Sequence, residues 1–290
     1  MLQRQKTYID ESSKLYLVAT PIGNFSDMTY RAVETLKMVD DIYCEDTRIT
    51  GLLLSHFDIH TKMHSYHIHN EQELTSKIIE KIKDGKNIAV VSDAGMPGIS
   101  DPGFLIAKKA IEENVDVCVI PGVSASLTAL VGSGIPSNTF TFIGFLNSKD
   151  QKRKEELQNL KYKEETLILY EAPHRIKETL EMINEIMPNR QIVLSRELRK
   201  KYEEYLRGKA SEILEVVAEL KGEMVIIISG CSNEEAKENL LNLSVKEHYQ
   251  YYLNAGYDQK EAMKKVAKQK GISKSEVYKH LLQLGSVLNC

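Results

Sequence analysis

Three residues suited to proton transfer and phosphate binding lie together at positions 45–48, in the run Glu-Asp-Thr-Arg. A carboxylate such as Glu45 or Asp46 can orient a hydroxyl group or accept its proton, and the guanidinium of Arg48 can hold a phosphate through two parallel hydrogen bonds. Acidic residues are equally typical of a helix N-terminus, where they complement the helix dipole. The spacing therefore leaves two interpretations open, a catalytic or substrate-binding segment and an ordinary helix start.

A second polar pair, His174 and Arg175, follows the run Tyr-Glu-Ala-Pro at 170–173. Proline is common in the first turn of a helix, so this run predicts the junction between a strand and a helix. Two interpretations again remain. The side chains point into a cleft between domains and act on a substrate there, or they merely complete the helix start.

Histidine is concentrated between residues 56 and 69, which hold five of the eight histidines in the chain. Imidazole is the commonest metal ligand, and His64, His67 and His69 form the densest group. No HExxH motif and no paired Cys/His spacing accompanies them. We therefore expect no metal site, and we interpret these histidines as surface or substrate-contacting side chains.

The segment 92–103, Ser-Asp-Ala-Gly-Met-Pro-Gly-Ile-Ser-Asp-Pro-Gly, holds three glycines and two prolines directly after an apolar run. Because glycine lacks a Cβ and proline fixes φ, such a loop exposes backbone N–H groups and lets a ligand approach the chain closely. A purely structural turn rarely needs so many glycines and prolines together with two aspartates. The composition favours a ligand-binding loop.

Similar turns follow two other apolar runs, at 120–126 (Ile-Pro-Gly-Val-Ser-Ala-Ser) and at 20–24 (Thr-Pro-Ile-Gly-Asn). Ser124 is placed to begin a helix, whose first N–H groups lack partners within the helix. Ligands of open α/β sheets bind at the carboxyl ends of the strands, so three such turns predict one pocket at that edge. The chain has no GxxxxGK[ST] run, and no GxGxxG follows its first strand, which argues against a P-loop nucleotidase and a dinucleotide-binding loop.

Apolar runs alternate with helical patterns along the first two-fifths of the chain, as expected of βαβ units around a mostly parallel sheet. A cluster of turn-forming residues at 132–139 predicts a boundary with a second α/β domain. We expect an N-terminal α/β domain at 1–136, a C-terminal α/β domain at 137–232 and a small helical module at 243–290. The predicted strands are 15–19, 41–44, 87–91, 116–120, 140–144, 166–170, 191–195 and 224–229, and the predicted helices are 29–38, 71–83, 149–160, 173–186 and 211–220.

The helical module is rich in lysine. Residues 244–285 carry eight lysines against four acidic residues, although the whole chain has a net charge of −3. Its helical patterns are separated by Gly256 and Gly271, and Ser273 with Glu276 forms a capping box before the last helix. Short helices joined by a tight glycine turn are typical of a helix-turn-helix, and the lysine excess favours a polyanion as partner. A helical tail that only packs on the body is the alternative.

The composition is that of a globular protein. At 290 residues the chain is long enough for two domains, and 42% hydrophobic and 27% charged residues are close to the globular average. No apolar run approaches the roughly 20 residues needed to cross a bilayer. The polar opening residues lack the apolar centre of a secretory signal. We expect a cytoplasmic protein that has no membrane partner.

Seven short motifs occur in a fixed order, and together they resemble the tetrapyrrole methylase superfamily, in particular its ribosomal RNA cytidine 2′-O-methyltransferases. The resemblance runs from about residue 14 to about residue 230, and the lysine-rich end is similar to the C-terminal extension of those enzymes. The chain departs from the pattern at Met96, where a small polar residue is expected, and at Val123, where proline is frequent. The motifs are TPIGN (20–24), EDTR (45–48), HNE (69–71), SDAGMPGISDPG (92–103), PGVSA (121–125), YEAPHR (170–175) and SREL (195–198).

This resemblance implies two α/β domains with S-adenosyl-L-methionine held in the cleft between them, and a homodimer. In-line attack on a sulfonium methyl group is assisted by a base or an orienting hydrogen bond, for which we take Asp46 or Glu45 first and His174 next. Phosphate contacts are expected from Arg48, Arg175, Lys264, Lys265 and Lys274. The cofactor contacts implied by the motifs, most of them main-chain or apolar, are Gly95, Met96, Pro97, Ile99, Asp101, Ser124, Ala125 and Tyr170.

The activity implied is S-adenosylmethionine-dependent 2′-O-methylation of a cytidine ribose in the decoding region of small-subunit (16S) ribosomal RNA. The assembled small subunit or a late precursor is the expected substrate, because sequence-specific RNA recognition favours unpaired bases. Two alternatives stay open. One is a methyltransferase that acts on carbon atoms of corrins or porphyrins, and the other is a non-catalytic RNA-binding assembly factor that retains the cofactor pocket.

Overall fold

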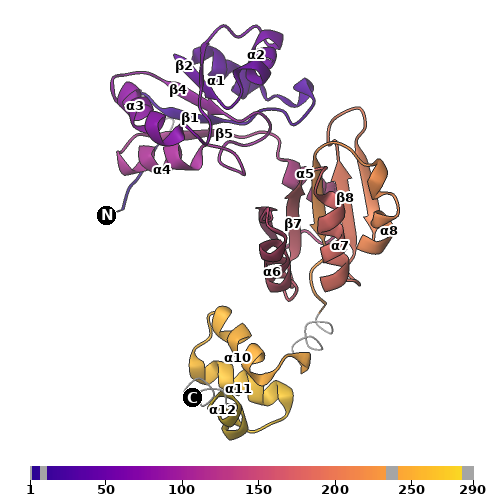
Figure 1. The fold of residues 1–290 in the computed structure, drawn as a ribbon. Helices are drawn as coiled ribbons and strands as arrows, with labels where there is room; N and C mark the ends of the chain where they lie inside the picture. Colours follow the sequence, from indigo (N-terminus) through magenta and orange to yellow (C-terminus); the bar gives the residue numbers. More distant parts are fainter. Residues whose placement is uncertain (1, 7–11, 233–240, 283–290) are drawn as a thin grey trace. The chain divides into compact units, whose positions relative to one another are not determined.

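The computed structural model describes residues 2–6, 12–232 and 241–282, and Figure 1 shows its helices and strands. The chain forms two compact units. The first comprises residues 1–157 and 166–229, and the second comprises residues 158–165 and 230–290. Both β-sheets belong to the first unit, and the predicted boundary near residue 136 falls between them.

The first sheet has five parallel strands in the order β3-β2-β4-β1-β5. Four of them were predicted to within one residue at each end. The fifth, β3, was missed because its sequence, Lys-Met-His-Ser, is not apolar, and a strand at the edge of a sheet needs only partial burial. The strands are β1 (Leu15–Val18), β2 (Asp41–Cys44), β3 (Lys62–Ser65), β4 (Ile88–Val91) and β5 (Val117–Ile120).

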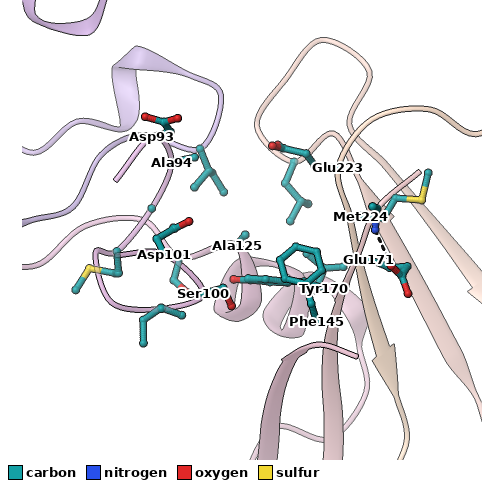
Figure 2. A pocket seen from close by; sticks show the side chains of 18 of the residues that line it. Asp93, Ala94, Ser100, Asp101, Ala125, Phe145, Tyr170, Glu171, Glu223 and Met224 are labelled. Carbon is teal, nitrogen blue, oxygen red and sulfur yellow. Dashed lines mark hydrogen bonds between the residues drawn. The ribbon is translucent and has the colours of Figure 1, made fainter. Parts of the chain in front are cut away.

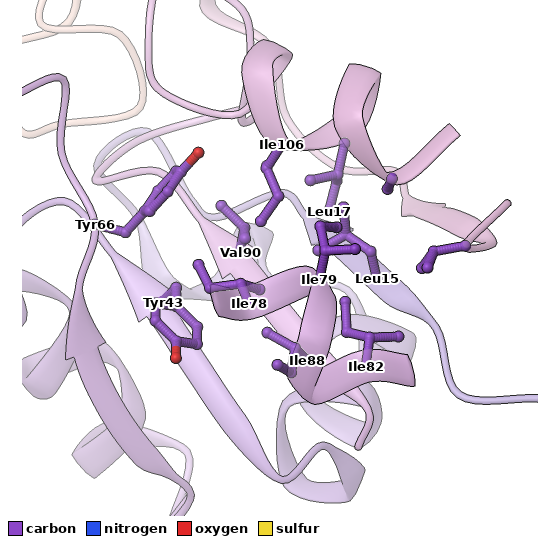
Figure 3. Packing of buried hydrophobic residues seen from close by; sticks show 12 residues of the cluster. Leu15, Leu17, Tyr43, Tyr66, Ile78, Ile79, Ile82, Ile88, Val90 and Ile106 are labelled. Carbon is purple, nitrogen blue, oxygen red and sulfur yellow. The ribbon is translucent and has the colours of Figure 1, made fainter. Parts of the chain in front are cut away.

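Helices cover both faces of this sheet. Figure 3 shows the first face, where Leu15 and Val90 of the sheet pack against Ile79 of α3. On the other face, Val18 and Ile42 lie in a second buried cluster, to which α1 and α2 contribute. Burial on both faces explains the continuous apolar runs of the strands. The helices are α1 (Tyr30–Met38), α2 (Thr47–His56), α3 (Glu71–Lys83) and α4 (Phe104–Glu112).

The second sheet is mixed, in the order β6-β7-β10-β8-β9, with β6 parallel to β7 and all other neighbours antiparallel. Helix α5 precedes this sheet in the sequence and packs on it, because Ala129 and Leu130 share a buried cluster with Ile168 and Val225. The strands are β6 (Phe140–Phe145), β7 (Thr166–Glu171), β8 (Ile192–Arg196), β9 (Glu204–Gly208) and β10 (Met224–Ile228). The helices of this half are α5 (Ala125–Ser133), α6 (Asp150–Leu160), α7 (Ile176–Ile186) and α8 (Ala210–Leu214).

The single helix predicted at 211–220 is wrong. Helix α8 ends at Leu214, and a separate 3-10 turn, Val217–Glu219, follows it. The β-branched pair Val216 and Val217 favours helix less than an unbranched pair would, which weakens the helix where it ends.

The described part of the second unit is mainly a bundle of three helices: α10 (Val245–Asn254), α11 (Gln259–Lys270) and α12 (Lys274–Leu282). Gly271 ends α11 in the left-handed conformation, with φ of +66°. The predicted capping box is confirmed, since the Glu276 N–H donates to Ser273 Oγ at 3.1 Å and the Ser273 N–H donates to Glu276 Oε2 at 2.7 Å. Tyr252, Val266 and Val277 belong to its small core. None of the helices described is long and apolar enough to span a membrane.

Candidate functional site

A cavity of about 360 Å³ opens in the first unit, at the carboxyl edge of the parallel sheet. Turns that follow β1, β2, β4 and β5 line one side of it, and Figure 2 shows Asp93 and Asp101 on that side. Phe145 of β6, Tyr170 of β7 and Glu223 beside β10 line the other side. The volume lies within the roughly 300–1,000 Å³ of small-molecule pockets, and this edge is where open α/β sheets bind ligands.

The glycine- and proline-rich loop after β4 is tied down by its own backbone. Thr20 and Gly95 exchange two backbone hydrogen bonds, of 2.9 and 3.0 Å, which join the turn after β1 to the loop after β4. The Gly98 N–H donates to the Pro102 carbonyl at 3.1 Å, and the Ile99 N–H also bonds within the loop. The prediction that this loop presents free amides is therefore wrong for these three N–H groups, which hold the loop in shape.

Two glycines of the loop have conformations that other residues rarely adopt. Gly95 has φ of +86° and Gly103 has φ of +142°. A Cβ on Gly103 would stand 2.8 Å from the backbone nitrogen of Gly98, closer than real Cβ atoms approach. The backbone at Gly103 thus lies so close to the backbone of Gly98 that only glycine fits there.

The cavity is lined by acidic residues. Among the described residues that line it there are five carboxylates and no lysine, arginine or histidine. Apolar side chains such as Ile22, Leu198 and Val225 supply much of the remaining wall. The site therefore suits a ligand that is part apolar and part cationic. The five carboxylates are those of Glu45, Asp93, Asp101, Glu171 and Glu223.

Most of these carboxylates have a partner in the protein. Asp93 accepts the backbone N–H of Asp46 at 3.0 Å. Glu223 accepts a hydrogen bond from Lys200 Nζ at 3.0 Å. Glu171 is buried and accepts a hydroxyl hydrogen bond of 2.6 Å from helix α7. These contacts fix three of the five side chains.

Burial and mutual repulsion raise the pKa values of the remaining acids. Burial is the main cause of the raised pKa of Glu45, and the nearby charge of Asp93 adds to it. The pKa of Asp101 is raised to about 7, first by burial and then by the negative charges of Glu45, Asp93 and Glu223. At neutral pH, the Asp101 carboxyl group is thus close to the midpoint of its titration.

Of the eight predicted cofactor contacts, seven line the cavity and Pro97 does not. The ring of Tyr170 packs edge-on against Phe142 and Phe145, with centroids 5.1 and 5.6 Å apart. Burial raises the pKa of its hydroxyl group. The seven are Gly95, Met96, Ile99, Asp101, Ser124, Ala125 and Tyr170.

The three predicted candidates for the base lie in different surroundings. Glu45 lines the cavity. Asp46 instead caps α2, where it accepts the Arg48 N–H at 2.8 Å and pairs with the Arg48 side chain at 2.6 Å. These bonds lower the pKa of Asp46 to about 2, which makes it a weak base. His174 is exposed at the start of α7 and does not line the cavity. The geometry favours Glu45 among the three.

The two predicted phosphate-binding arginines also differ in their surroundings, because one is exposed to solvent and the other is bonded within the protein. The Arg48 side chain is 89% exposed, and its contact with Asp46 leaves it open to solvent. Arg175 turns inward, with Nε 3.3 Å from Glu171 and a 3.0 Å hydrogen bond to the Leu146 carbonyl. A phosphate contact by Arg175 would require these bonds to break.

No group of three metal-ligating side chains occurs within the part of the chain that the structure describes. His64 lies 2.8 Å from Asp41 and stacks on the Tyr43 ring, so its contacts are structural.

Apart from Tyr170, sequence reasoning missed the wall that comes from the second half of the unit. Phe145, Glu223 and Met224 line the cavity but stand in no turn rich in glycine or proline. Leu198 lies within the Ser-Arg-Glu-Leu motif at 195–198, as Tyr170 lies within the motif at 170–175. For the other three, no local pattern signals a ligand.

The family of Tetrapyrrole (Corrin/Porphyrin) Methylases matches residues 14–214, and the chain belongs to this family. It is therefore an enzyme of the methyltransferase class.

Known relatives match over nearly their full length. The chain is 48% identical over 285 residues to the Ribosomal RNA small subunit methyltransferase I of Bacillus subtilis (strain 168), covering 96% of this chain and 98% of that protein. It is 45% identical to the protein of the same name from Halalkalibacterium halodurans, covering 93% and 94%.

The fold is also that of a uroporphyrin-III C-methyl transferase from Thermus thermophilus, solved as a complex with S-adenyl homocysteine. The TM-score is 0.55 at 17% identity, and the match covers 75% of this chain and 97% of that one. This likeness confirms the expected two-sheet architecture.

Proposed function

We propose that this enzyme transfers a methyl group from S-adenosyl-L-methionine to the ribose 2′-oxygen of a cytidine in the decoding region of small-subunit ribosomal RNA. The observation that carries the proposal is the charge of the cavity, which has five carboxylates and no basic side chain among its described lining residues. Such a cavity repels phosphates and attracts cations. The cationic methyl donor therefore belongs inside it, and the RNA backbone outside.

The cavity residues fit this cofactor. S-adenosylmethionine carries an apolar-faced adenine, a sulfonium and an ammonium group. The apolar wall formed by Ile22, Ile99 and Val225 suits the adenine, and the carboxylates suit the two cations. Pro97 does not line the cavity, so we expect it to affect the cofactor only through the shape of the loop.

The RNA substrate is supported by the extent of the similarity. The relatives named as ribosomal RNA methyltransferases cover 93% or more of this chain. The uroporphyrin methylase matches over 97% of its own length yet covers only 75% of this chain. About a quarter of the chain thus has no counterpart in that enzyme, and the family match itself ends at residue 214. This additional part favours RNA over a corrin or porphyrin as the substrate, and an enzyme that acts on ribosomal RNA is expected in the cytoplasm, with the ribosomes.

The second unit supplies basic side chains suited to RNA. Lys264 and Lys274 are exposed, on α11 and at the start of α12. Lys265 is partly covered, with Nζ 4.3 Å from the Tyr257 ring centroid, which gives it a structural contact as well. In the first unit, the exposed guanidinium of Arg48 is available to a phosphate. Because of its internal bonds, Arg175 is not part of this proposal.

S-adenosylmethionine supplies an electrophilic methyl group when bound. The residues of the enzyme must then align the ribose hydroxyl with the methyl–sulfur bond, and positioning of this kind contributes up to roughly 7–11 kcal/mol. Exclusion of water by the apolar wall strengthens every charge interaction in the cavity. Among the bases predicted from sequence, the choice narrows to Glu45, the one that lines the cavity.

We also propose that the enzyme is a homodimer. Helix α5 exposes Leu127 and Val131, at 49% and 80%, although it is apolar along most of its length. The edge strand β5 exposes Val119 at 47%. Apolar side chains on an exposed helix and on a sheet edge suit burial against a second copy of the chain. Sedimentation equilibrium of the wild type and of Val131→Glu tests this, since the dimer should dissociate in the variant.

Methyl transfer to isolated small ribosomal subunits tests the activity. Subunits from cells that lack this protein are incubated with the enzyme and S-adenosylmethionine labelled in its methyl group, beside a porphyrin precursor in a parallel reaction. We expect label in the 16S RNA of the subunit. Label in the tetrapyrrole alone would identify a corrin or porphyrin methylase, and RNA binding with no label in either would identify an assembly factor.

A further inference from the structure

Two exposed lysines close to the cavity form no ion pair among the described residues. They are Lys149, directly before α6, and Lys152, in its first turn. Phe145, which ends β6, lines the cavity and is 54% exposed. Lys149 follows it by four residues, so their Cα atoms lie within about 14 Å. The segment 146–152 therefore lies near the rim of the cavity, on the side that the second sheet supplies.

The other charges of this region are paired within the protein. Residues 146–154 hold four basic side chains and one acidic one. The acidic one, Asp150, pairs with the buried guanidinium of Arg153. Lys154 Nζ lies 2.7 Å from a carboxylate of α7. Of the four cations, the two exposed lysines thus remain for a partner outside the described part of the chain.

The backbone of the turn after β6 is fixed by Arg175, the last residue of the Tyr-Glu-Ala-Pro-His-Arg motif. Its Nη2 donates to the Leu146 carbonyl at 3.0 Å and to the Asn147 carbonyl at 3.3 Å. Its Nε lies 3.3 Å from Glu171, a buried residue that lines the cavity. Asn147 in turn accepts the Lys149 N–H through its side chain at 3.0 Å. One guanidinium thus joins the end of β7 to the turn that carries the lysines, in a geometry that a lysine side chain cannot reproduce.

The cavity itself is unsuited to the RNA backbone. It has five carboxylates and no basic side chain among its described lining residues, so it repels phosphates. An acceptor ribose that reaches the methyl donor must keep its neighbouring phosphates outside, and cations are needed where the strand leaves the cavity. Arg48 is exposed three residues after Glu45, on the side of the parallel sheet. The segment 146–152 supplies cations on the other side.

We propose that the segment 146–152 binds the RNA backbone next to the acceptor nucleotide, with Lys149 and Lys152 on its phosphates and Arg175 as the residue that positions the turn. This inference rests on the proposed function. An ammonium group attracts a phosphate as a point charge without a fixed geometry, and phosphate contacts set the register of a nucleic acid on a protein. Arg175 acts through the turn and touches no RNA, so its internal bonds persist in the complex.

The first test removes the two charges. The variant Lys149→Gln with Lys152→Gln is compared with Lys62→Gln with Lys86→Gln, whose lysines are also exposed. Lys62 begins β3 and Lys86 precedes β4, so both lie at the amino edge of the parallel sheet, opposite the cavity. Binding to small subunits from cells that lack this protein is measured without cofactor, over a range of salt concentrations at fixed Mg²⁺. The Kd for S-adenosylmethionine is measured by calorimetry.

The variant without Lys149 and Lys152 should bind small subunits about tenfold or more weakly near about 0.1 M salt. The slope of log affinity against log salt should become shallower by about 1.4–1.8, because each lost phosphate contact removes about 0.7–0.9. Its Kd for S-adenosylmethionine should stay within about twofold of wild type, since neither lysine lines the cavity. The control variant should keep the wild-type values of all three quantities.

The second test asks whether Arg175 acts through the lysines. Arg175→Lys keeps the charge but loses the paired carbonyl contacts, and we expect about 3- to 10-fold weaker binding to small subunits. In the variant that lacks both lysines, the same substitution should change binding by less than about twofold, because residues that act as one unit have non-additive effects. Asn147→Ala loosens the same turn from outside the cavity lining and should show the same dependence, also where Arg175→Lys does not fold.

A salt slope within about 0.3 of wild type for the variant without Lys149 and Lys152 would overturn the proposal. Equal losses in the two lysine pairs would overturn it as well, because the effect would then come from net charge alone. A full effect of Arg175→Lys in the protein that lacks both lysines would overturn the positioning role. If the wild type binds no small subunits and labels no RNA, the proposed function fails and this inference fails with it. Normal labelling of RNA by a lysine variant of wild-type affinity would overturn this inference alone.

Discussion

Substitution of Gly103 by alanine should weaken cofactor binding more than any change to a nearby charge. Gly103 has φ of +142°, and a Cβ there would stand 2.8 Å from the nitrogen of Gly98 and 3.1 Å from the carbonyl carbon of Pro97. Both contacts are with backbone, so no side chain can rotate away. Strain of this kind costs about 1–3 kcal/mol, and the loop will move to relieve it.

The variant loop must adopt the strained native conformation again before the cofactor can bind, and this costs the same strain energy. Since 1.4 kcal/mol corresponds to a tenfold change, the Kd for S-adenosylmethionine should rise by about 5- to 150-fold. Isothermal titration calorimetry measures this directly. Gly85→Ala is the matched control, because Gly85 also has a positive φ, of +100°, but no atom lies within 4 Å of its would-be Cβ and it is outside the cavity.

The control should lose stability in thermal unfolding and keep its cofactor affinity. Equal cofactor affinity of folded Gly103→Ala and wild type would contradict this prediction. Equal weakening by both glycine variants would refute it too, because the effect would then come from general destabilisation.

Three further predictions concern other parts of the chain. Asp46→Ala should lower the unfolding temperature at neutral pH. The pKa of Asp46 is about 2 in the folded protein, below the ordinary 3.8, so its stabilising effect is lost on acidification, and the difference in unfolding temperature between variant and wild type should narrow as the pH falls from about 5 to about 3. Tyr170→Ala should weaken S-adenosylmethionine binding about tenfold or more in calorimetry, and Tyr170→Phe should leave it within about twofold, because the ring forms the wall of the cavity. Lys274→Gln should reduce RNA affinity and lower the slope of log affinity against log salt by about 0.7–0.9, whereas Lys265→Gln should also destabilise the second unit, since that ammonium lies over the Tyr257 ring.

The core of the first sheet was predictable because its strands are buried on both faces. Four short apolar runs, such as Ile88–Val91, stand out from their surroundings for this reason. No range was predicted for helices α2, α4 and α5, although a helix was expected to begin at Ser124, where α5 begins. The pattern of α5 is apolar on nearly all sides, since Ala129 and Leu130 pack on the second sheet while Leu127 and Val131 are exposed. An all-round apolar helix gives no clear helical period.

The wall of the cavity that the turns of the parallel sheet form could also be predicted from the sequence. Turns at the carboxyl ends of parallel strands must share an edge, so their glycines and prolines marked one wall of the cavity. The other wall depends on how the second sheet is placed, which no local pattern encodes. Phe145 and Glu223 therefore appear in the sequence as ordinary residues beside strands.

The roles of adjacent residues also depend on geometry. Glu45 and Asp46 are neighbours at the end of β2, yet the first lines the cavity and the second caps α2. Spacing alone left these interpretations open. The structure confirms the helix start, and a catalytic or substrate-binding role of Glu45 stays a prediction.

The position of the methyl group on the RNA shows whether the ribose of a cytidine is the acceptor. Small subunits from cells lacking the enzyme are labelled with the methyl donor, and their 16S RNA is hydrolysed with alkali. A 2′-O-methyl group blocks cleavage of the adjoining phosphodiester, so we expect the label in an alkali-resistant dinucleotide whose first nucleoside is a cytidine. Label in mononucleotides, which would indicate methylation of a base, or absence of label from the RNA, would contradict it.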